Sequence, residues 1–467
     1  METKPLLPVL ENVNITDTAE NGLGVGRVDN MVVFVEGAVP GDVADVQVFR
    51  KKKKFLEGRL VRLIESSPDR TEPVCSHFGT CGGCKWQHLN YDRQLFYKQR
   101  QVEEVLKRIG KIAEPDISPI IGSEQSYHYR NKLDFSCSDK RWLTREELHA
   151  GIPMKADVIG FHVPGRFDKI LDITKCYLQD DLSNQIRNEV KRFSIENDFR
   201  FFDVMDQEGF LRDLILRSTS TGEWMVIVVF KQDLETEIKL LLNHLVKTFP
   251  QITSLLYIIN PKRNSTIFDL PVNVFHGKDH IHEVMEGLKF KISAKSFYQT
   301  NSGQAYELYK IARNFAALTG TELVYDLYTG TGTIANFVAA KAKKVIGIDN
   351  VSDAIEDAKE NSRVNGITNT EFFSGDLNKT LNEEFIQKNG KPDVIITDPP
   401  RSGMHPEAVM KMAEYSPSRI VYISCNPSTQ ARDIELLSEK YRVDKIQPVD
   451  LFPQTTHVEN VILLTLK

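Results

Sequence analysis

The sequence lacks the features that would place it in a membrane or outside the cell. No apolar run approaches the ~20 residues that span a bilayer, and residues 1–5 do not show the charged-then-apolar layout of a signal peptide. We therefore expect a cytoplasmic protein that does not enter membranes. Cysteine is also scarce, since the 467 residues include only six. In a reducing compartment such cysteines are more often metal ligands or catalysts than disulfide partners.

The chain also lacks an excess of positive charge. Its 59 lysines and arginines are outnumbered by 64 aspartates and glutamates, which gives a formal net charge of −5. A nucleic-acid partner could therefore bind only where cations gather on one face. Residues 50–54, Arg-Lys-Lys-Lys-Lys, form one such group, and a solvated hairpin tip is the alternative interpretation. Residues 127–132 interleave aromatic and basic side chains, which can stack on bases and hold phosphates, although core packing explains them as well.

Three kinds of pattern follow one another along the chain, and its length suits about three domains. The first is an alternation of apolar and polar residues with frequent turn signals, which is typical of a small OB-type β-barrel. A mixed stretch of short strands and helices follows, and then a regular alternation that predicts a doubly wound, Rossmann-like α/β sheet. We therefore predict a barrel domain over residues 1–67, a central α+β domain over 68–292 and an α/β domain over 293–467.

The last of these domains is predicted in most detail. Short buried strands are expected over residues 322–327, 344–348, 393–397 and 419–424. An amphipathic helix is expected over 352–365, with Ser352 as its N-cap and Gly366 beyond its end. Ligands bind at the carboxyl ends of the strands in a sheet of this kind, so the polar residues that follow these strands are candidates for a site.

A glycine loop follows the first of these strands. Residues 326–333 read Asp-Leu-Tyr-Thr-Gly-Thr-Gly-Thr, and the glycines let the backbone approach a ligand closely. A dinucleotide site would carry a third glycine, whereas Gly332 is followed by Thr333, Ile334 and Ala335, so the loop favours S-adenosylmethionine over NAD. Asp349 ends the second strand, where its carboxylate can accept hydrogen bonds from both ribose hydroxyls. Asp376, after the third strand, suits a contact near the adenine or a plain loop.

A single cysteine, Cys425, follows the strand Ile-Val-Tyr-Ile-Ser. A thiol beside a methyl-donor site suggests chemistry on a carbon that is not methylated without covalent help, such as C5 of a pyrimidine. The Asn-Pro-Ser-Thr that follows can start a helix, and a thiol near a helix amino terminus has a lowered pKa. The turn Asp398-Pro399-Pro400 continues with Arg401, where amine-methylating enzymes usually carry an aromatic residue. A buried structural cysteine is the alternative interpretation.

Two candidate bases stand near the end of the chain. His457 and Glu459 are two residues apart, so on an extended segment they face the same side. Because Glu459 lies just before the apolar run 461–466, we expect its carboxylate to be half-buried, with a solvated surface position as the alternative. Either side chain could act as a base.

The remaining cysteines suggest a metal site. Cys75, Cys81 and Cys84 lie close together in the sequence with Gly82 and Gly83 between them, and Cys176 follows some ninety residues later. Four thiolates suit either an iron–sulfur cluster or zinc. The five-residue first spacing and the glycines, which leave room for a bulky cluster, favour iron–sulfur over zinc. Cys137 is interpreted as structural.

The motifs around the candidate catalytic residues resemble those of the RNA uracil-5-methyltransferases. The similar segments are D-P-P-R-S-G ending at Gly403, I-V-Y-I-S-C-N-P-S-T ending at Thr429 and D-L-F-P-Q-T-T-H-V-E ending at Glu459. The resemblance covers essentially the whole chain, from a barrel of the type called TRAM onward. It implies that Cys425 adds to C6 of a flipped-out uridine and that Glu459 removes the C5 proton. It also implies that S-adenosylmethionine is bound by Gln299, Tyr328, Asp349 and Asp398.

The cysteine group resembles that of the family branch that acts on ribosomal RNA. This resemblance implies a [4Fe-4S] cluster held by Cys75, Cys81, Cys84 and Cys176, and formation of 5-methyluridine in 23S rRNA. We expect a monomer that binds RNA. The same chemistry on tRNA is one alternative. A non-catalytic RNA-binding or iron–sulfur redox protein that has kept the fold is another, against which intact Cys425 and Glu459 argue.

Overall fold

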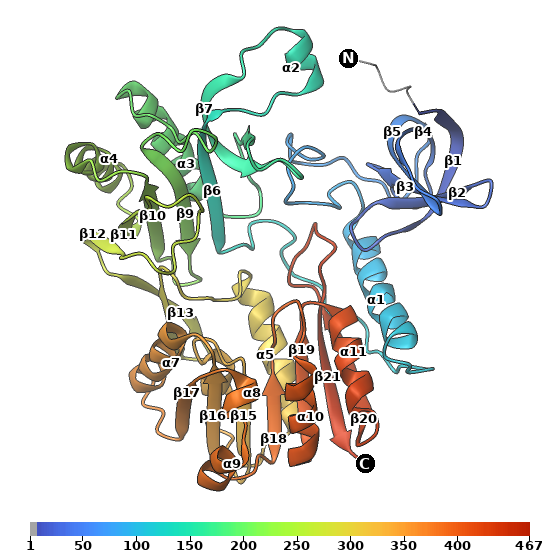
Figure 1. The fold of residues 1–467 in the computed structure, drawn as a ribbon, viewed down its shortest axis with the longest axis vertical. Helices are drawn as coiled ribbons and strands as arrows, with labels where there is room; N and C mark the ends of the chain where they lie inside the picture. Colours follow the sequence, from blue (N-terminus) through green and yellow to red (C-terminus); the bar gives the residue numbers. More distant parts are fainter. Residues whose placement is uncertain (1–6) are drawn as a thin grey trace. The chain divides into compact units, whose positions relative to one another are not determined.

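The computed structural model describes residues 7–467, which fall into two compact units (Figure 1). The first unit extends to Gln101 and includes Phe452–His457, and the second comprises Val102–Leu451 and Val458–Lys467. Helix α1 (Tyr91–Arg108) contains the boundary between them. Because the second unit holds two separate large sheets, the division into three domains stays a prediction.

The first unit contains a closed five-stranded barrel, as the alternating sequence predicts. Its strands are β1 (Val9–Thr18), β2 (Gly24–Val28), β3 (Met31–Glu36), β4 (Val43–Lys51) and β5 (Phe55–Glu65). Their inward side chains form a small apolar core that includes Val13, Ile15, Val33, Val35, Val46 and Val48. The basic run 51–54 joins β4 to β5 with all four lysines exposed, so it lies at a hairpin tip.

The amino-terminal part of the second unit is built on a seven-stranded sheet of mainly antiparallel strands. In spatial order the strands are β12 (Asn273–Gly277), β11 (Ile252–Ile259), β10 (Trp224–Phe230), β9 (Leu211–Ser218), β6 (Lys132–Lys140), β7 (Lys155–His162) and β8 (Ile170–Asp172). The helices here are α2 (Arg145–His149), α3 (Asp181–Glu196) and α4 (Glu235–Thr248). Every residue of β10 is buried, which explains its uninterrupted apolar sequence.

A hairpin of β13 (His280–Met285) and β14 (Leu288–Ser293) precedes the carboxyl-terminal sheet. That sheet has the order β17 (Thr370–Ser374), β16 (Lys344–Asp349), β15 (Leu323–Leu327), β18 (Val394–Thr397), β19 (Arg419–Ser424), β21 (Glu459–Leu466) and β20 (Tyr441–Val449). The first five strands are parallel and β21 runs antiparallel to β19. The predicted Rossmann-like fold and its four strands are confirmed.

Helices alternate with these strands along the chain (Figure 1). They are α5 (Ser302–Ala316), α6 (Thr333–Ala339), α7 (Ser352–Val364), α8 (Leu377–Thr380), α9 (Glu383–Asn389), α10 (Pro406–Tyr415) and α11 (Pro427–Leu437). Side chains such as Tyr325, Ile346, Ile395 and Tyr422 are fully buried between strands and helices.

The start of α7 differs from its prediction. Ser352 is the first helical residue and not the N-cap, because Val351 occupies the cap position and its side chain makes no capping hydrogen bond. Asp349 supplies the acceptor instead, since its Oδ1 receives the N–H of Val351 at 2.9 Å. Gly366 lies beyond the helix end with φ of 64°, as predicted.

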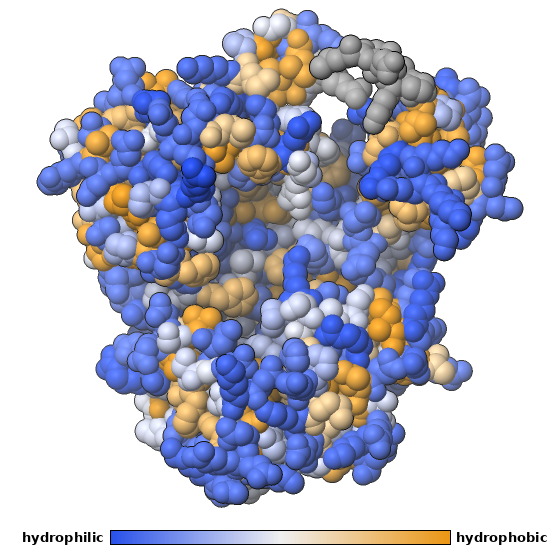
Figure 2. Space-filling model, viewed as in Figure 1, coloured by the Kyte–Doolittle hydropathy of each residue, from blue (hydrophilic) through white to orange (hydrophobic). Residues whose placement is uncertain are grey.

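Among residues 7–467, no helix is both long and apolar enough to cross a membrane. Figure 2 shows hydrophilic side chains over most of the visible face, with hydrophobic residues scattered among them.

Candidate active site

Neighbouring parallel strands of the carboxyl-terminal sheet end at one edge (Figure 1), and polar residues follow them in the sequence. Leu327 is in register with Ile348 and with Thr397, so Tyr328, Asp349 and Asp398 come directly after positions that lie side by side. Thr397 is in turn in register with Tyr422 of β19. Ser424 pairs with Asn460, which brings Cys425 beside the start of β21 at Glu459.

Gln299 is brought to the same edge by α5. The helix is capped by Asn301, whose Nδ2 also donates to the Leu451 carbonyl at 3.0 Å, and Gln304 donates to the Asp450 carbonyl at 2.8 Å. These carbonyls directly follow β20, whose last residue pairs with Glu459. The structure therefore gathers at one edge all six residues that the sequence predicts for catalysis and donor binding.

The aromatic and basic stretch 127–132 lies beside this edge. Asn131 Nδ2 donates to the Gln299 carbonyl and to Ser302 Oγ, both at 2.9 Å. Tyr129 is 8% exposed, so core packing explains that aromatic residue. The stretch thus supports the segment that carries Gln299.

The glycine loop has the shape expected for close approach to a ligand. Tyr328, Gly330 and Gly332 have φ of 61°, 53° and 71°, and a Cβ on Gly332 would lie 2.8 Å from that of Ala358. The Gly330 N–H donates to Asp349 Oδ2 at 3.0 Å. Asp349 is half-buried, and a carboxylate oxygen that accepts one hydrogen bond can accept another from a ribose hydroxyl. These residues fit S-adenosylmethionine.

Replacement of Asp349 by alanine is expected to weaken binding of S-adenosylhomocysteine about 10–100-fold, because hydrogen bonds to a charged group are lost. Calorimetric titration of the full chain measures this change. Asp353, an exposed carboxylate on α7, is the matched control, and Asp353→Ala should leave the dissociation constant unchanged. Equal affinities of Asp349→Ala and the wild type would contradict the assignment.

Asp326 is a buried carboxylate of this loop that sequence reasoning did not single out. It is 1% exposed, and its Oδ2 accepts from Thr329 Oγ1 at 2.5 Å and from the Ala335 N–H at 3.1 Å. Burial raises its pKa to about 7. An aspartate inside an otherwise apolar strand is the signal that could have identified it. Asp376 is exposed and caps α8 by accepting the Asn378 N–H at 2.8 Å, which agrees with the plain-loop interpretation.

The Cys425 thiol is not activated in the way that the sequence predicts. A helix does begin at Pro427, and Asn426 caps it. However, the pKa of Cys425 is raised to about 11, first by burial and then by the negative charges of Glu459 and Asp398, while Arg401 opposes the shift. The prediction of a lowered pKa is therefore wrong, because non-local carboxylates and burial outweigh the helix terminus. In the protein alone the sulfur is a thiol at neutral pH.

Glu459 is more deeply buried than expected. It is 2% exposed, and burial raises its pKa well above the ordinary value, with Asp398 adding to the shift. His457 is exposed and lies before β21 begins. It is therefore outside the strand, and the strand geometry that would place it on the same side as Glu459 does not apply to it. Burial raises the pKa of Asp398 to about 7. The pKa values of the Cys425 thiol and of both carboxyl groups are thus raised together, because burial disfavours the charged form of each.

Alkylation of Cys425 by iodoacetamide is expected to accelerate about tenfold per pH unit between roughly pH 7 and pH 10. The thiolate is the reactive form, and its fraction grows in this way below a thiol's pKa. Mass spectrometry of the peptide that contains Cys425 measures the rate, and Cys425→Ser identifies the signal. A rate that levels off below about pH 8 would show a lowered pKa instead.

Helix α11 holds strands β19 and β21 and the turn 398–404 in place. Asp433 is fully buried, and its Oδ2 accepts the Tyr422 hydroxyl at 2.6 Å and the Met404 N–H at 2.9 Å. Gln430 Nε2 donates to the carbonyls of Tyr422 and Asn460 at 2.8 and 3.0 Å. Both polar residues fall on the buried face of an amphipathic helix, which is the signal that could have revealed them.

Tyr309 of α5 is a further buried neighbour of the site. It is 5% exposed, and its pKa is raised by burial and by the nearby Tyr298, Asp398, Asp326 and Glu459. Nothing in the sequence separates it from an ordinary core residue of an amphipathic helix.

The predicted cysteine ligands are distributed over both units. Cys75, Cys81 and Cys84 lie half-buried on one stretch of the first unit, where the Cys75 N–H donates to Gln87 Oε1 at 3.1 Å. Cys176 is buried and belongs to the second unit. Within residues 7–467 no three His, Cys, Asp or Glu side chains form a group that could hold a metal ion. The iron–sulfur cluster therefore stays a prediction.

Comparison with known proteins agrees with this geometry. Residues 214–467 match the family described as tRNA (uracil-5-)-methyltransferase, and residues 11–61 match the TRAM domain. An uncharacterized RNA methyltransferase of Bacteroides thetaiotaomicron is 57% identical over 453 residues, covering 96% of this chain and 100% of that protein. Another from Porphyromonas gingivalis is 54% identical over 460 residues, covering 97% and 99%.

A solved structure is similar over nearly the full length. The crystal structure of the Pyrococcus abyssi tRNA (uracil-54, C5)-methyltransferase in complex with S-adenosyl-L-homocysteine has a TM-score of 0.75 and 28% sequence identity. The similarity covers 98% of this chain and 100% of that chain.

The sheet order, the glycine loop and the polar edge define a class I methyltransferase that depends on S-adenosylmethionine. The chain belongs to the tRNA (uracil-5-)-methyltransferase family. It is an RNA methyltransferase with an amino-terminal TRAM barrel, which confirms the family that the motifs predict.

Proposed function

We propose that this protein methylates C5 of a uridine in 23S rRNA and forms 5-methyluridine, with Cys425 as nucleophile and Glu459 as base. The observation that carries the proposal is the juxtaposition of a half-buried thiol and a buried carboxyl group beside a donor loop at one sheet edge. An enzyme that methylates amines needs no such nucleophile. We further propose that it acts as a monomer in the cytoplasm.

The chemistry assigns a separate step to each residue. Cys425 gives its proton to the Asp398 carboxylate, and its sulfur adds to C6 of uracil, which moves the C5–C6 π electrons onto the C4 carbonyl as an enolate. When bound, S-adenosylmethionine supplies the methyl group that the C5 carbon takes up. Glu459 then accepts the C5 proton, the C5–C6 double bond re-forms and the C6–S bond breaks. Gln299, Tyr328, Asp349 and Asp398 are proposed to orient the donor.

The raised pKa values suit this order of events. A thiol with a pKa of about 11 is a strong nucleophile once it is deprotonated, and Asp398, with a pKa of about 7, is proposed to hold its proton. Glu459, whose pKa is raised, is a stronger base than an ordinary carboxylate once it is ionised. The nearby Arg401 counters the negative charges of the site. The target base has to leave its stack to reach this edge, and the TRAM barrel is proposed to hold the surrounding RNA.

A second candidate substrate is tRNA. It is favoured by the likeness to the Pyrococcus abyssi tRNA (uracil-54, C5)-methyltransferase. Ribosomal RNA is favoured by the resemblance of the cysteine group to the ribosomal branch of the family.

Incubation of the purified protein with labelled S-adenosylmethionine and unmodified 23S rRNA or tRNA transcripts tests this choice. Nuclease digestion then identifies the labelled nucleoside in each RNA. Label in 5-methyluridine from 23S rRNA is the expected result. Label in tRNA alone would keep the chemistry and replace the substrate, whereas label in another nucleoside would contradict the proposed chemistry.

We also propose that Cys75, Cys81, Cys84 and Cys176 hold a [4Fe-4S] cluster. Protein purified without oxygen should then contain about four iron and four sulfide per chain, and Cys81→Ser should lose them. Cys137, buried in β6, provides the matched control, since Cys137→Ala should keep its iron. Stoichiometric zinc in place of iron would contradict the cluster.

A further inference from the structure

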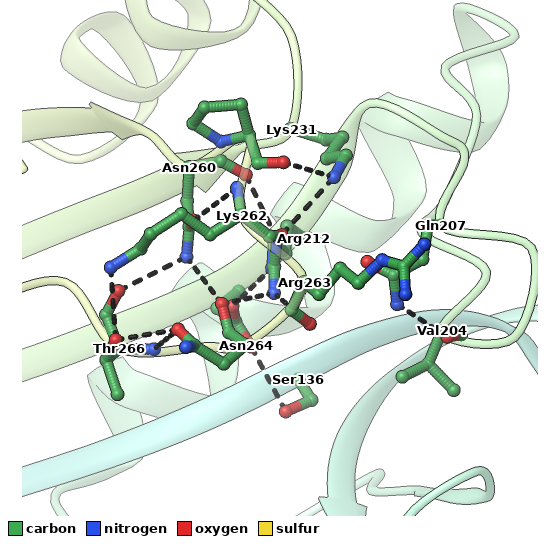
Figure 3. A network of polar contacts seen from close by, with 12 residues as sticks. Ser136, Val204, Gln207, Arg212, Lys231, Asn260, Lys262, Arg263, Asn264 and Thr266 are labelled. Carbon is green, nitrogen blue, oxygen red and sulfur yellow. Dashed lines mark hydrogen bonds and ion pairs between the residues drawn. The ribbon is translucent and has the colours of Figure 1, made fainter.

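A buried arginine supports an exposed loop between β11 and β12 (Figure 3). The Arg212 side chain on β9 is 1% exposed. It donates hydrogen bonds to four backbone carbonyls within residues 260–264. The acceptors are the carbonyls of Lys262 at 2.6 Å, Asn264 at 2.7 Å, Asn260 at 3.0 Å and Arg263 at 3.4 Å. Five planar N–H donors let one guanidinium bind this many oxygens.

Two further side chains, Asn260 and Lys231, hydrogen bond to the same loop. Asn260 is fully buried, accepts the Lys262 N–H at 3.1 Å and donates to the Asn264 carbonyl at 3.1 Å. Lys231 Nζ donates to the Pro261 carbonyl at 2.7 Å. Because the carbonyls of residues 260–264 point inward, the outer side of the loop is left to its side chains, and their positions are set in advance.

The loop lies over an excess of positive charge. The Lys231 ammonium group donates to backbone carbonyls of the loop. Arg212 forms an ion pair with Asp213 at 3.6 Å. Burial raises the pKa of Asp213 to about 6, so at neutral pH it is mostly ionised and offsets one of the two cations. Arg263 adds a third cation, which is exposed. In Figure 3 its side chain extends away from the backbone carbonyls that Arg212 binds. A polyanion would neutralise these charges.

An exposed aromatic ring lies at the end of the same loop. Phe268 is 68% exposed, although a ring of its size is usually buried in a core. Lys295 Nζ donates to the Phe268 carbonyl at 2.9 Å. Since Lys295 lies four residues before Gln299, this bond ties the loop to the segment that enters the active site. An exposed ring beside cations is the usual arrangement for stacking an unpaired base.

We propose that the loop 260–268 is a docking site for single-stranded RNA next to the target uridine, where Phe268 stacks on a base and Arg263 binds a phosphate. The inference rests on the proposed function for the identity of the substrate. By this proposal, a loop of the seven-stranded sheet that contains β11 and β12 selects the RNA segment flanking the modified nucleotide.

Binding of a short fluorescent oligouridylate and of a 23S rRNA transcript to the full-length protein tests this assignment. Phe268→Ala is expected to raise the dissociation constant about tenfold, and Phe268→Trp to restore it, whereas Phe268→Leu keeps bulk without a ring face and should not. Arg263→Ala should reduce the slope of log affinity against log salt by about 0.7, the value for one phosphate contact in a single strand.

The kinetic readout separates docking from a structural defect. Phe268→Ala should raise the KM for RNA and leave kcat unchanged. Lys388, exposed on α9 at the opposite edge of the carboxyl-terminal sheet, is the control for charge, and Lys388→Ala should keep the salt slope.

Unchanged affinity and salt slope in both loop variants, while wild-type protein methylates RNA, would overturn the docking inference alone. An effect of the loop variants seen only with partly assembled ribosomes would overturn it in favour of docking on protein.

The wild type separates this inference from the proposed function. Wild-type protein that binds both RNAs without forming 5-methyluridine would contradict only the proposed chemistry. Wild-type protein that binds neither the oligouridylate nor the 23S rRNA transcript would contradict both proposals.

Discussion

Replacement of Cys425 by alanine is expected to reduce 5-methyluridine formation by at least about 10,000-fold. Catalytic residues that act together lose most of the rate enhancement when the nucleophile alone is removed. C5 of uracil becomes a nucleophile only after the sulfur has added to C6. Arg401 and Asp398 cannot replace that step, since neither donates an electron pair to carbon here. Quantification of 5-methyluridine in digested RNA measures the loss.

The control for this substitution is Cys137→Ala, which removes a thiol from β6 and should keep wild-type turnover. Binding of S-adenosylmethionine should also survive in Cys425→Ala, since the glycine loop hydrogen bonds to Asp349 and not to the cysteine. Methyl transfer within about tenfold of the wild type in Cys425→Ala would contradict a covalent route.

The second large effect is expected for Glu459→Gln. Glutamine has nearly the same shape and cannot take up the C5 proton, so one methyl group should be transferred per protein and the RNA should stay attached through Cys425. Because the pKa of Glu459 is raised well above its ordinary value by burial, the neutral side chain should be tolerated by the fold. Denaturing gel electrophoresis with labelled RNA should show the stalled complex.

The double variant Cys425→Ala with Glu459→Gln provides the matched control and should show no attached RNA. Wild-type turnover by Glu459→Gln would transfer the role of base to another group, and Asp398, with its pKa of about 7, would be the next to test.

The strands, the order of the elements and the gathering of site residues follow from sequence patterns. Buried parallel strands such as β15 and β19 read as short apolar runs, and residues after them meet at one edge of the sheet for geometric reasons. For this reason the sequence alone places Tyr328, Asp349, Asp398 and Cys425 at that edge.

The properties that sequence reasoning missed depend on contacts between distant segments. The pKa of Cys425 is raised by burial and by two carboxyl groups, Asp398 directly after β18 and Glu459 at the start of β21, and these outweigh the adjacent helix terminus. The cap of α7 comes from Asp349, three residues before the helix. The buried position of Glu459 depends on where β21 begins, and the role of Arg212 depends on a loop some fifty residues later.

Trapping on 5-fluorouridine RNA tests the covalent methylation of uridine most directly. Fluorine at C5 cannot leave as a proton, so after sulfur addition and methyl transfer the RNA should remain bound to the protein. With S-adenosylmethionine and 5-fluorouridine-substituted 23S rRNA, we expect a denaturation-resistant complex whose nucleotide is mapped by mass spectrometry to the peptide containing Cys425. A complex mapped to another residue, or no complex from a protein that methylates uridine in the unmodified transcript, would contradict the proposed mechanism.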